Sequence, residues 1–253
     1  MGAEQSQFET WRTSFAGAVP ATDYDTYRPG YPDEAVRWVL GVPDTHPDML
    51  DVLDLGAGTG ILTSAVERLG HRVVAVDPSE AMLEALALRL PGVDARGGTA
   101  EQIPLADASV DAVVLGQAWH WVDPDVAGPE VARVLRPGGW LGLLWNSRDS
   151  TVPWVAELYQ VAGEPVRERG GGDEPPRVTG PFGALEQATL DNPHLLPSAE
   201  AVGRLAGTWS WVRTGPDPDR VMAQVVEVAA RHASSDGSVA VPQQTECFRV
   251  RRH

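Results

Sequence analysis

The sequence contains no lysine, because all 20 of its basic residues are arginine. Without a lysine amine the chain cannot form a Schiff base, anchor pyridoxal phosphate or provide a Walker-type phosphate lysine. It also contains a single cysteine, Cys247. One cysteine excludes an internal disulfide framework and any CxxC metal or redox motif. We expect no metal site.

Long hydrophobic runs are also missing. No stretch approaches the ~18–20 consecutive apolar residues that a membrane-spanning helix needs. The first residues, MGAEQSQFETWR, have neither a basic start nor an apolar core, so we expect no secretory signal and a cytoplasmic location.

Positive charge is scarce relative to negative charge. The 253 residues include 35 acidic and 20 basic side chains, which gives a net charge of −15. Such a balance repels nucleic-acid phosphates and anionic membranes, so we expect neither as a partner. With 43% hydrophobic residues, the chain is long enough for one globular domain with a substantial core.

Short apolar runs alternate with amphipathic segments up to residue 147. Strands are expected at 49–56, 71–77, 93–100, 110–117 and 140–146, and helices at 33–40, 61–70, 79–90 and 129–139. Ser79 is the expected N-cap of the helix at 79–90. Strand–helix alternation with short connections predicts an α/β fold with a doubly wound, mostly parallel sheet.

The pattern loosens after residue 147. Helices are expected at 152–163, 197–212 and 219–233, a Gly/Pro-rich loop at 167–181, and an edge strand at 245–252. We interpret residues 1–253 as a single domain with three parts. Residues 1–48 form an N-terminal lid and first helix, 49–147 a cofactor-binding core, and 148–253 a substrate cap that completes the sheet.

The segment Asp54-Leu55-Gly56-Ala57-Gly58-Thr59-Gly60 lies between a predicted strand and a predicted helix. Glycines there allow a sharp turn and close approach of a ligand to the backbone, although any α/β crossover can use such a turn. The GxGxG spacing differs from the GxGxxG dinucleotide fingerprint. The next strand ends in Asp77, where an acidic side chain can hold the two hydroxyls of an adenosine ribose. The pattern favours an adenosine ligand without a pyrophosphate bridge.

Five blocks in order resemble the class I S-adenosylmethionine-dependent methyltransferases: DLGAGTG, VVAVDPSEAML, GTAEQIPLADASVDAVV, GQAWHW and EVARVLRPGGWL. They cover roughly residues 50–145. The flanking segments YDTYRPGYP and GTWSW are similar to the small-molecule, trans-aconitate methyltransferase-like subgroup. The resemblance implies a seven-stranded Rossmann-like fold and S-adenosylmethionine as cofactor, with S-adenosylhomocysteine as product.

The resemblance also implies roles for individual residues. Gly56, Ala57 and Gly58 would pass under the methionine part of the cofactor, with Asp54 facing its ammonium. Asp77 would bind the ribose and Met82 would press on the adenine, which Thr99, Ala100 and Glu101 would border. Thr99 stands where many relatives have an acidic residue. Gln117 would lie beside the methionine chain, and Tyr24 and Arg28 would close over the cofactor carboxylate. Asp54 could instead only cap the turn, and Arg28 could pair with a surface carboxylate.

His120 lies between two tryptophans at the predicted mouth of the site. It is a candidate general base, and the alternative is a hydrogen-bonded histidine that shapes the pocket wall. Five tryptophans at strand ends or in the presumed cap are candidates for a substrate pocket, or for core packing: Trp119, Trp121, Trp145, Trp209 and Trp211. An aromatic wall suits an apolar or planar acceptor and a sulfonium.

The predicted function is methyl transfer from S-adenosylmethionine to an O, N or C atom of a small-molecule acceptor. A carboxylate is one such acceptor. Two alternatives stay open at this point. One is an enzyme that uses the sulfonium for cyclisation or elimination, and the other is a non-catalytic binding module. The GxGxG spacing contradicts a dehydrogenase, and the absence of a GxSxG motif contradicts an α/β-hydrolase.

Overall fold

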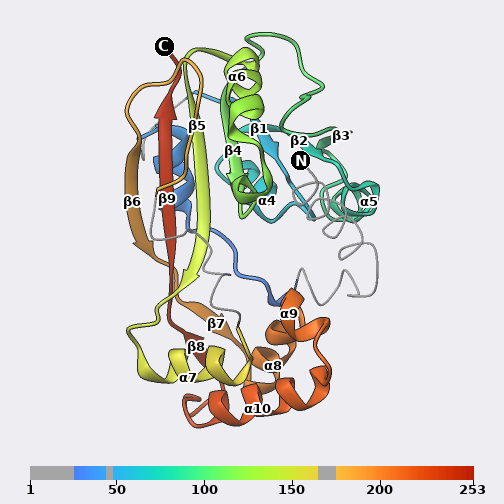
Figure 1. Cartoon of the computed structure of the whole chain (residues 1–253), viewed down its shortest axis with the longest axis vertical. Coiled ribbons are helices and arrows are strands. Elements are labelled where there is room, and N and C mark those ends of the chain that lie inside the picture. The colour runs from blue at the N-terminus through green and yellow to red at the C-terminus, as the bar shows by residue number, and fades with distance from the viewer. Residues whose placement is uncertain (1–25, 44–47, 165–174) are drawn as a thin grey trace. The chain divides into compact units, whose positions relative to one another are not determined.

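The computed structural model describes residues 26–43, 48–164 and 175–253, and the chain divides into two compact units (Figure 1). Of the described residues, 30–43, 48–146, 175–190 and 245–253 form the sheet unit. Residues 26–29, 147–164 and 191–244 form the helical unit.

The sheet unit is built on one seven-stranded sheet in the order β3-β2-β1-β4-β5-β9-β6. Its strands are β1 (Asp51–Leu55), β2 (Arg72–Asp77), β3 (Asp94–Gly97), β4 (Val110–Gly116), β5 (Leu135–Arg148), β6 (Glu186–Asp191) and β9 (Gln243–Arg251). The first five strands in this order pair in parallel. β9 runs antiparallel to β5 and β6, as its arrow in Figure 1 shows. The mostly parallel α/β fold that the sequence predicts is therefore confirmed.

Alternating apolar side chains on the strands give the sheet two buried faces. On one face, Val52 and Val114 pack with helices α3 (Asp33–Leu40) and α4 (Ile61–Arg68). On the other face, Leu53 and Val113 pack with helix α6 (Pro124–Val134). A smaller cluster joins helix α5 (Glu80–Arg89) to Ala75 of β2. Because both faces are covered, the functional residues collect at the ends of the strands.

Local signals explain where two of these helices begin and end. α3 follows Pro32, has Asp33 and Glu34 in its first turn, and ends at Gly41 with φ +70°. α5 begins after Ser79 as expected, but the Ser79 side chain makes no capping hydrogen bond. The backbone N–H of Ser79 instead donates a hydrogen bond to Oδ1 of Asp77 (2.8 Å).

The helix expected at 129–139 is shifted toward the N-terminus. Asp123 caps α6 by accepting from the backbone N–H of Asp125 (3.0 Å), and Pro124 occupies the first helical position. The helix ends at Val134, and Pro137-Gly138-Gly139 lies inside β5. The pairing of β5 with β4 shifts register at this point, which accommodates the proline and glycines.

The edge-strand prediction for 245–252 was wrong. β9 lies between β5 and β6, and β6 forms that edge of the sheet. The sequence of β6, EQATLD, is mostly exposed and polar, so it has no apolar run from which a strand is predicted. An ion pair between Arg249 and Glu186 (2.7 Å) joins the two strands.

The helical unit has a core of its own. It contains helices α7 (Pro153–Val161), α8 (Ala199–Gly207), α9 (Ser210–Arg213) and α10 (Pro218–Ala230), and the antiparallel pair β7 (His194–Leu196) and β8 (Val239–Val241). The helix expected at 197–212 is broken in two, because Trp209 has an extended backbone (φ −75°, ψ 134°). Buried residues such as Leu158, Val202 and Val225 join α7, α8 and α10.

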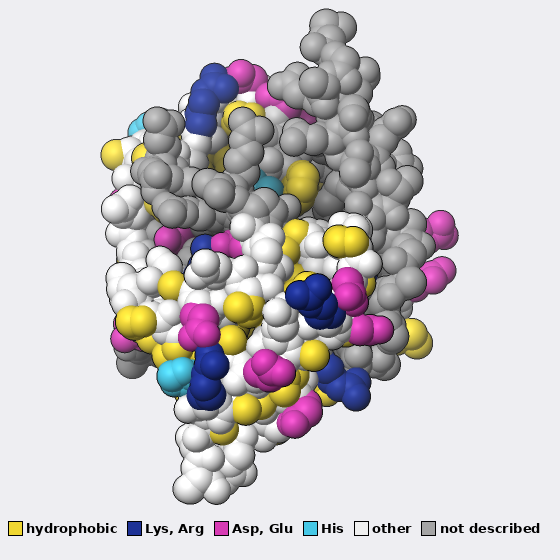
Figure 2. All heavy atoms as spheres, turned by 60° about the horizontal axis from the view of Figure 1, so that its bottom comes forward, with side chains coloured by type: hydrophobic (Ala, Val, Ile, Leu, Met, Phe, Trp, Pro, Cys, Tyr) yellow, Lys and Arg dark blue, Asp and Glu magenta, His cyan; other side chains and the backbone are white. Residues whose placement is uncertain are grey.

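On the face shown in Figure 2, arginine and acidic side chains are interspersed with hydrophobic ones. Among the helices that the structure describes, none has the length and apolar character needed to cross a bilayer.

Candidate functional site

The turn between β1 and α4 has the geometry that its glycines predict. Gly56 and Gly58 adopt φ angles of +73° and +55°, which side chains of L-residues rarely tolerate. A Cβ at Gly56 would lie 2.8 Å from the Cβ of Ala118, so this glycine permits close packing of the turn against the segment after β4. A Cβ at Gly58 would meet no atom of the described residues within 4 Å. The turn is therefore open at Gly58, where a ligand can approach the backbone.

Asp77 at the end of β2 is bonded to this turn. Its side chain is 3% exposed, and its Oδ2 accepts from the backbone N–H of Gly58 (2.9 Å) while Oδ1 accepts from Ser79. Burial raises the pKa of the carboxyl above its ordinary value, against the lowering effect of the two backbone hydrogen bonds. Each carboxylate oxygen has a second lone pair, so Asp77 keeps the capacity to accept from ligand hydroxyls.

Asp54 at the end of β1 is completely buried. Its Oδ2 accepts from the hydroxyl of Thr63 (2.6 Å), whereas Oδ1 has no hydrogen-bond partner within the part of the chain that the structure describes. Burial raises the pKa of Asp54 to about 7, and the nearby charge of Asp77 adds to this rise. A buried carboxyl with one unused oxygen fits a cationic or hydrogen-bonding group of a ligand.

The segment expected to border the adenine follows β3. Thr99 and Gln102 exchange backbone hydrogen bonds (3.2 and 3.4 Å), and Ala100 is 8% exposed. The carboxylate of Glu101 accepts from the backbone N–H of Asp123 at the start of α6 (3.3 Å). Met82 is half-buried on α5.

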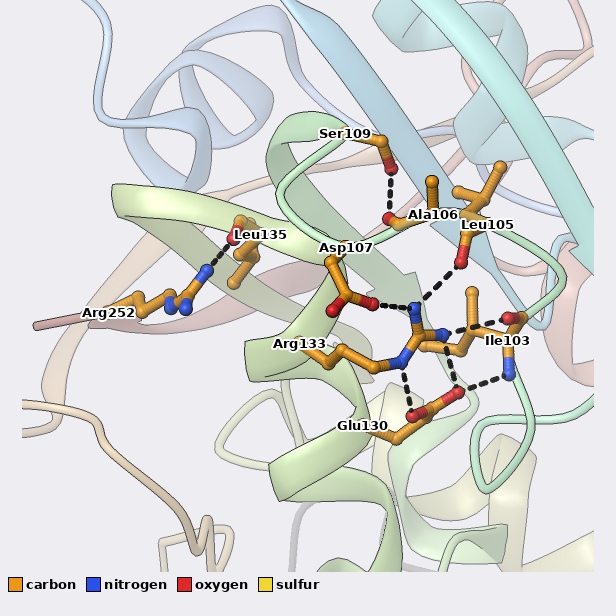
Figure 3. Close-up of polar contacts among 9 residues, drawn as sticks. All are labelled: Ile103, Leu105, Ala106, Asp107, Ser109, Glu130, Arg133, Leu135 and Arg252. Carbon is orange, nitrogen blue, oxygen red and sulfur yellow. Dashed lines mark hydrogen bonds and ion pairs between the residues drawn. The ribbon is translucent and has the colours of Figure 1, made fainter.

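Arg133 holds the continuation of this segment against α6, as Figure 3 shows. Its guanidinium donates to the carbonyls of Leu105 (2.8 Å) and Ile103 (3.1 Å) and to the carboxylates of Asp107 and Glu130. Glu130 in turn accepts from the backbone N–H of Ile103 (2.9 Å). The Arg133 guanidinium lowers the pKa of Glu130. One arginine therefore fixes the path of residues 103–107.

Arg133 and Glu130 were not among the predicted site residues. The available signal was their i, i+3 spacing on a predicted helix, which indicates an ion pair. The loop carbonyls that complete the network have no sequence signature.

Gln117 follows β4 and has a φ of +56°, although it is not glycine. Its backbone N–H donates to the carbonyl of Leu144 (2.9 Å), and its Nε2 donates to the carbonyl of Asn146 (3.0 Å). Such backbone strain persists where surrounding contacts impose it, often at a functional site. Gln117 lies at the carboxyl end of β4, and the next residue, Ala118, packs near Gly56.

Three of the predicted pocket tryptophans lie in the sheet unit. Trp119 is 5% exposed in the short 3-10 helix Trp119–Trp121, and its indole donates to the carbonyl of Arg177 (3.0 Å). The rings of Trp121 and His120 are 4.7 Å apart, and Trp121 is 37% exposed. Trp145 is buried, and its Nε1 donates to Nδ1 of His120 (3.4 Å). Trp121 and Trp145 therefore contact His120, while the Trp119 indole is bonded elsewhere.

His120 lies in an apolar environment that lowers its pKa by desolvation. More than a third of the residue's surface remains exposed, so solvent screens much of this shift. The lowered pKa favours a neutral His120 imidazole at neutral pH.

The other predicted residues lie in the helical unit or outside the described chain. Arg28 donates to the carbonyl of Thr208 (3.3 Å). The rings of Tyr159, Trp209 and Trp211 form a stack, with centroid separations of 4.6 and 5.2 Å. Tyr24 lies outside the described residues.

The structure thus brings most of the predicted cofactor residues into one unit. At or just beyond the carboxyl ends of β1, β2, β3 and β4 it places Asp54, Gly56, Ala57, Gly58, Asp77, Thr99, Ala100, Glu101 and Gln117. Ligands of open α/β sheets bind at this edge. Across residues 26–43, 48–164 and 175–253, no group of three or more His, Cys, Asp or Glu side chains is placed to hold a metal ion.

Known proteins with similar sequences are methyltransferases. Residues 53–143 match a family model described as a methyltransferase domain. An uncharacterised methyltransferase of Mycobacterium tuberculosis is 44% identical over 245 residues, which cover 94% of this chain and 95% of that protein. A methyltransferase-like protein of Schizosaccharomyces pombe is 39% identical over 166 residues, 64% of this chain and 60% of that protein.

Among solved structures, a protein described as a type II methyltransferase from Anaeromyxobacter dehalogenans aligns with a TM-score of 0.63 and 30% identity. The alignment covers 89% of this chain and 97% of that one. The chain therefore belongs to the methyltransferases, with the class I, Rossmann-like fold whose members use S-adenosylmethionine.

Proposed function

We propose that this methyltransferase binds S-adenosylmethionine in the sheet unit and transfers its methyl group to a small-molecule acceptor, releasing S-adenosylhomocysteine. The single observation that supports this most is the open glycine turn at Gly58, bonded through its N–H to the buried carboxylate of Asp77.

The residues present fit the parts of this cofactor. Asp54 has a buried, unused carboxylate oxygen that suits the ammonium of the methionine part. Asp77 suits the ribose hydroxyls, and the backbone around Ala100 suits the adenine edge. Gln117 would contact the methionine chain.

When bound, the cofactor supplies a methyl group on a positively charged sulfur. The chain's own part is to orient the acceptor against that methyl group, where orientation can contribute ~7–11 kcal/mol to catalysis. Buried aromatic side chains such as Trp145 exclude water from this part of the sheet unit.

The acceptor is proposed to react at an O, N or C atom. The similarity of the flanking segments to the trans-aconitate methyltransferase-like subgroup makes small carboxylic acids the first compounds to test. Arg148 does not support an acidic acceptor, because its guanidinium pairs with Glu164 and lies 4.4 Å from the ring centroid of Tyr159. The pair leaves little net positive charge there.

The test is incubation with S-adenosylmethionine labelled in the methyl group, with panels of carboxylic acids, amines and phenols as acceptors. We expect label in one acceptor class and an equal amount of S-adenosylhomocysteine, and much less of both with Asp77→Asn at a cofactor concentration near the wild-type affinity. Consumption of the cofactor without label in any acceptor would instead indicate cyclisation or elimination chemistry. No consumption with any acceptor would contradict the proposal.

A further inference from the structure

The contact between His120 and Trp145 lies entirely within the sheet unit. His120 is in the short helix after β4, and Trp145 is in β5, next to β4 in the sheet. Trp145 is 3% exposed, and its ring packs edge-on against Phe248 at a centroid distance of 5.7 Å. The indole is therefore held in place, and its Nε1 points at Nδ1 of His120 (3.4 Å).

This contact restricts the proton on the imidazole. An indole N–H only donates, so the nitrogen facing it must present a lone pair. A neutral imidazole has one protonated nitrogen and one lone-pair nitrogen. With Nδ1 accepting from Trp145, the proton of the neutral ring must lie on Nε2.

A base that removes a proton from an acceptor needs a free lone pair. In this tautomer the lone pair of Nδ1 is directed at Trp145, and Nε2 has only an N–H to offer. Among the described residues, the imidazole also contacts Trp121, whose ring is tilted by 48° to it.

We propose that His120 acts in methyl transfer as a hydrogen-bond donor through Nε2–H and not as a general base, with Trp145 as the positioning residue that sets this tautomer. The inference rests on the proposed function and defines how the acceptor is held. An acceptor at His120 presents one oxygen lone pair to Nε2–H and keeps a second lone pair for the methyl group.

The reaction then needs no proton transfer to this histidine. A second lone pair of the acceptor forms the bond to the methyl carbon, and the carbon–sulfur bond breaks with its electron pair going to sulfur. A carboxylate has lone pairs for both interactions and releases no proton, whereas an amine has one lone pair and cannot accept from Nε2–H while it attacks. The site therefore favours carboxylates over amines, and over phenols that need a base.

The tautomer can be measured directly by NMR on the whole protein labelled with ¹⁵N in its histidine side chains. Long-range ¹H–¹⁵N correlation distinguishes a protonated nitrogen from a lone-pair nitrogen. The chain has six histidines, and the signals that disappear in His120→Gln identify those of His120. At pH 7.5 we expect a protonated Nε2 and a lone-pair Nδ1. A protonated Nδ1, alone or in a charged ring, would overturn the proposal.

Matched tryptophan variants test the positioning role. Trp145→Phe keeps an aromatic ring and removes the N–H, so we expect the His120 signals to shift toward a mixture of tautomers. Trp119→Phe is the control, because that indole is equally buried and donates to the carbonyl of Arg177 instead. It should leave the His120 tautomer unchanged. If Trp145→Phe does not fold, the wild-type spectrum alone decides the tautomer.

An activity comparison separates donor from base once labelled-methyl transfer has identified an acceptor. Glutamine can donate from nearly the position of Nε2, whereas leucine cannot. We expect His120→Leu to lose roughly a hundredfold in kcat/KM, as removal of a single catalytic hydrogen-bond donor does, and His120→Gln to recover most of that loss. Equal losses in both variants would indicate a base. The NMR result does not depend on turnover, so failure of the proposed function and failure of this inference are distinguishable.

Discussion

The backbone N–H of Gly58 donates to the carboxylate of Asp77 at 2.9 Å, which joins the turn after β1 to the end of β2. Asp77 also accepts from Ser79 at the start of α5. One buried carboxylate therefore positions both the glycine turn and the following helix. The proposed cofactor site depends on this relationship.

Substitution of Gly58 tests the open turn. In Gly58→Ala the positive φ costs roughly 1–2 kcal/mol of stability, and the new methyl group occupies the space that a ligand would enter. We expect a modest loss in the free energy of unfolding, measured in urea, and a large loss of S-adenosylmethionine affinity, measured by titration.

Gly237 offers a matched control for this experiment. It also has a positive φ (+86°), and a Cβ there would likewise meet nothing within 4 Å. Gly237→Ala should lose similar stability without a change in cofactor affinity. If both alanine variants bind S-adenosylmethionine as the wild type does, the turn is not the cofactor site.

The buried carboxyl of Asp54 makes stability depend on pH. Its pKa in the folded protein, about 7, is above its ordinary value of 3.8, so the folded state binds this proton more tightly than the unfolded state. The stabilisation is complete below about pH 4 and is lost as the pH rises to about 7. A shift of this size corresponds to on the order of 4 kcal/mol.

Asp54→Asn should remove this dependence. We expect the free energy of unfolding of the variant, relative to wild type, to increase between pH 4 and pH 8, with urea denaturation as the measurement. Asp94 is a control of opposite sign, because the hydrogen bond from Arg96 lowers its pKa. In Asp94→Asn the relative stability should decrease as the pH rises toward about 4, and it should not change between pH 5 and pH 8. Parallel pH profiles for wild type and Asp54→Asn would contradict the account.

Arg133 should affect both stability and cofactor binding. Arg133→Gln removes the donors to Ile103 and Leu105 and leaves Glu130 without its cation. Hydrogen bonds to charged groups contribute roughly 1.5–3 kcal/mol each, so we expect a loss of at least about 2 kcal/mol in urea denaturation. Weaker binding of S-adenosylmethionine should accompany it, because the segment after Ala100 loses its anchor.

Arg177 provides the control for Arg133. Arg177 pairs with Asp125 of α6, the helix that also carries Arg133, but the side chains of Arg177 and Asp125 are both more than half exposed. Arg177→Gln should change stability by less than about 1 kcal/mol and leave cofactor affinity unchanged, as is typical of surface ion pairs. A similar effect of the two substitutions on affinity would argue against a role for Arg133 in positioning the adenine segment.

Much of the fold could be predicted from sequence because its signals are local. The helix at 33–40 begins and ends as predicted, since Pro32 and Gly41 mark its two ends. The first four strands fall within their predicted ranges. Three of them, β1, β2 and β4, are largely buried apolar runs, as is typical of parallel strands.

The features that were missed depend on tertiary contacts. β6 is a polar, mostly exposed strand, and it forms through pairing with β9. α6 is an exception, because Asp123 and Pro124 are a local start signal. Its start was predicted too late because Pro129, which lies inside the helix, resembles such a signal as well. The Arg133 network uses backbone carbonyls of a loop, which no sequence pattern marks.

The candidate site also has a part that local sequence predicts and a part that depends on tertiary contacts. Asp54, Gly58 and Asp77 were identified from a motif, and the structure places them at one edge of the sheet. The partner of His120 could not be predicted, because Trp145 lies on another strand and meets it only in the folded chain.

The central claim is tested most directly by calorimetric titration of S-adenosylmethionine and S-adenosylhomocysteine into wild type, Asp77→Asn and Asp219→Asn. Asp219 is an exposed acid at the start of α10 and serves as the charge-matched control. We expect micromolar binding of both ligands to wild type and Asp219→Asn. Binding to Asp77→Asn should be weaker by roughly 10–100-fold, the effect of losing a charge-assisted hydrogen bond. Absence of binding to wild type, or equal affinity in Asp77→Asn, would contradict the proposed cofactor site.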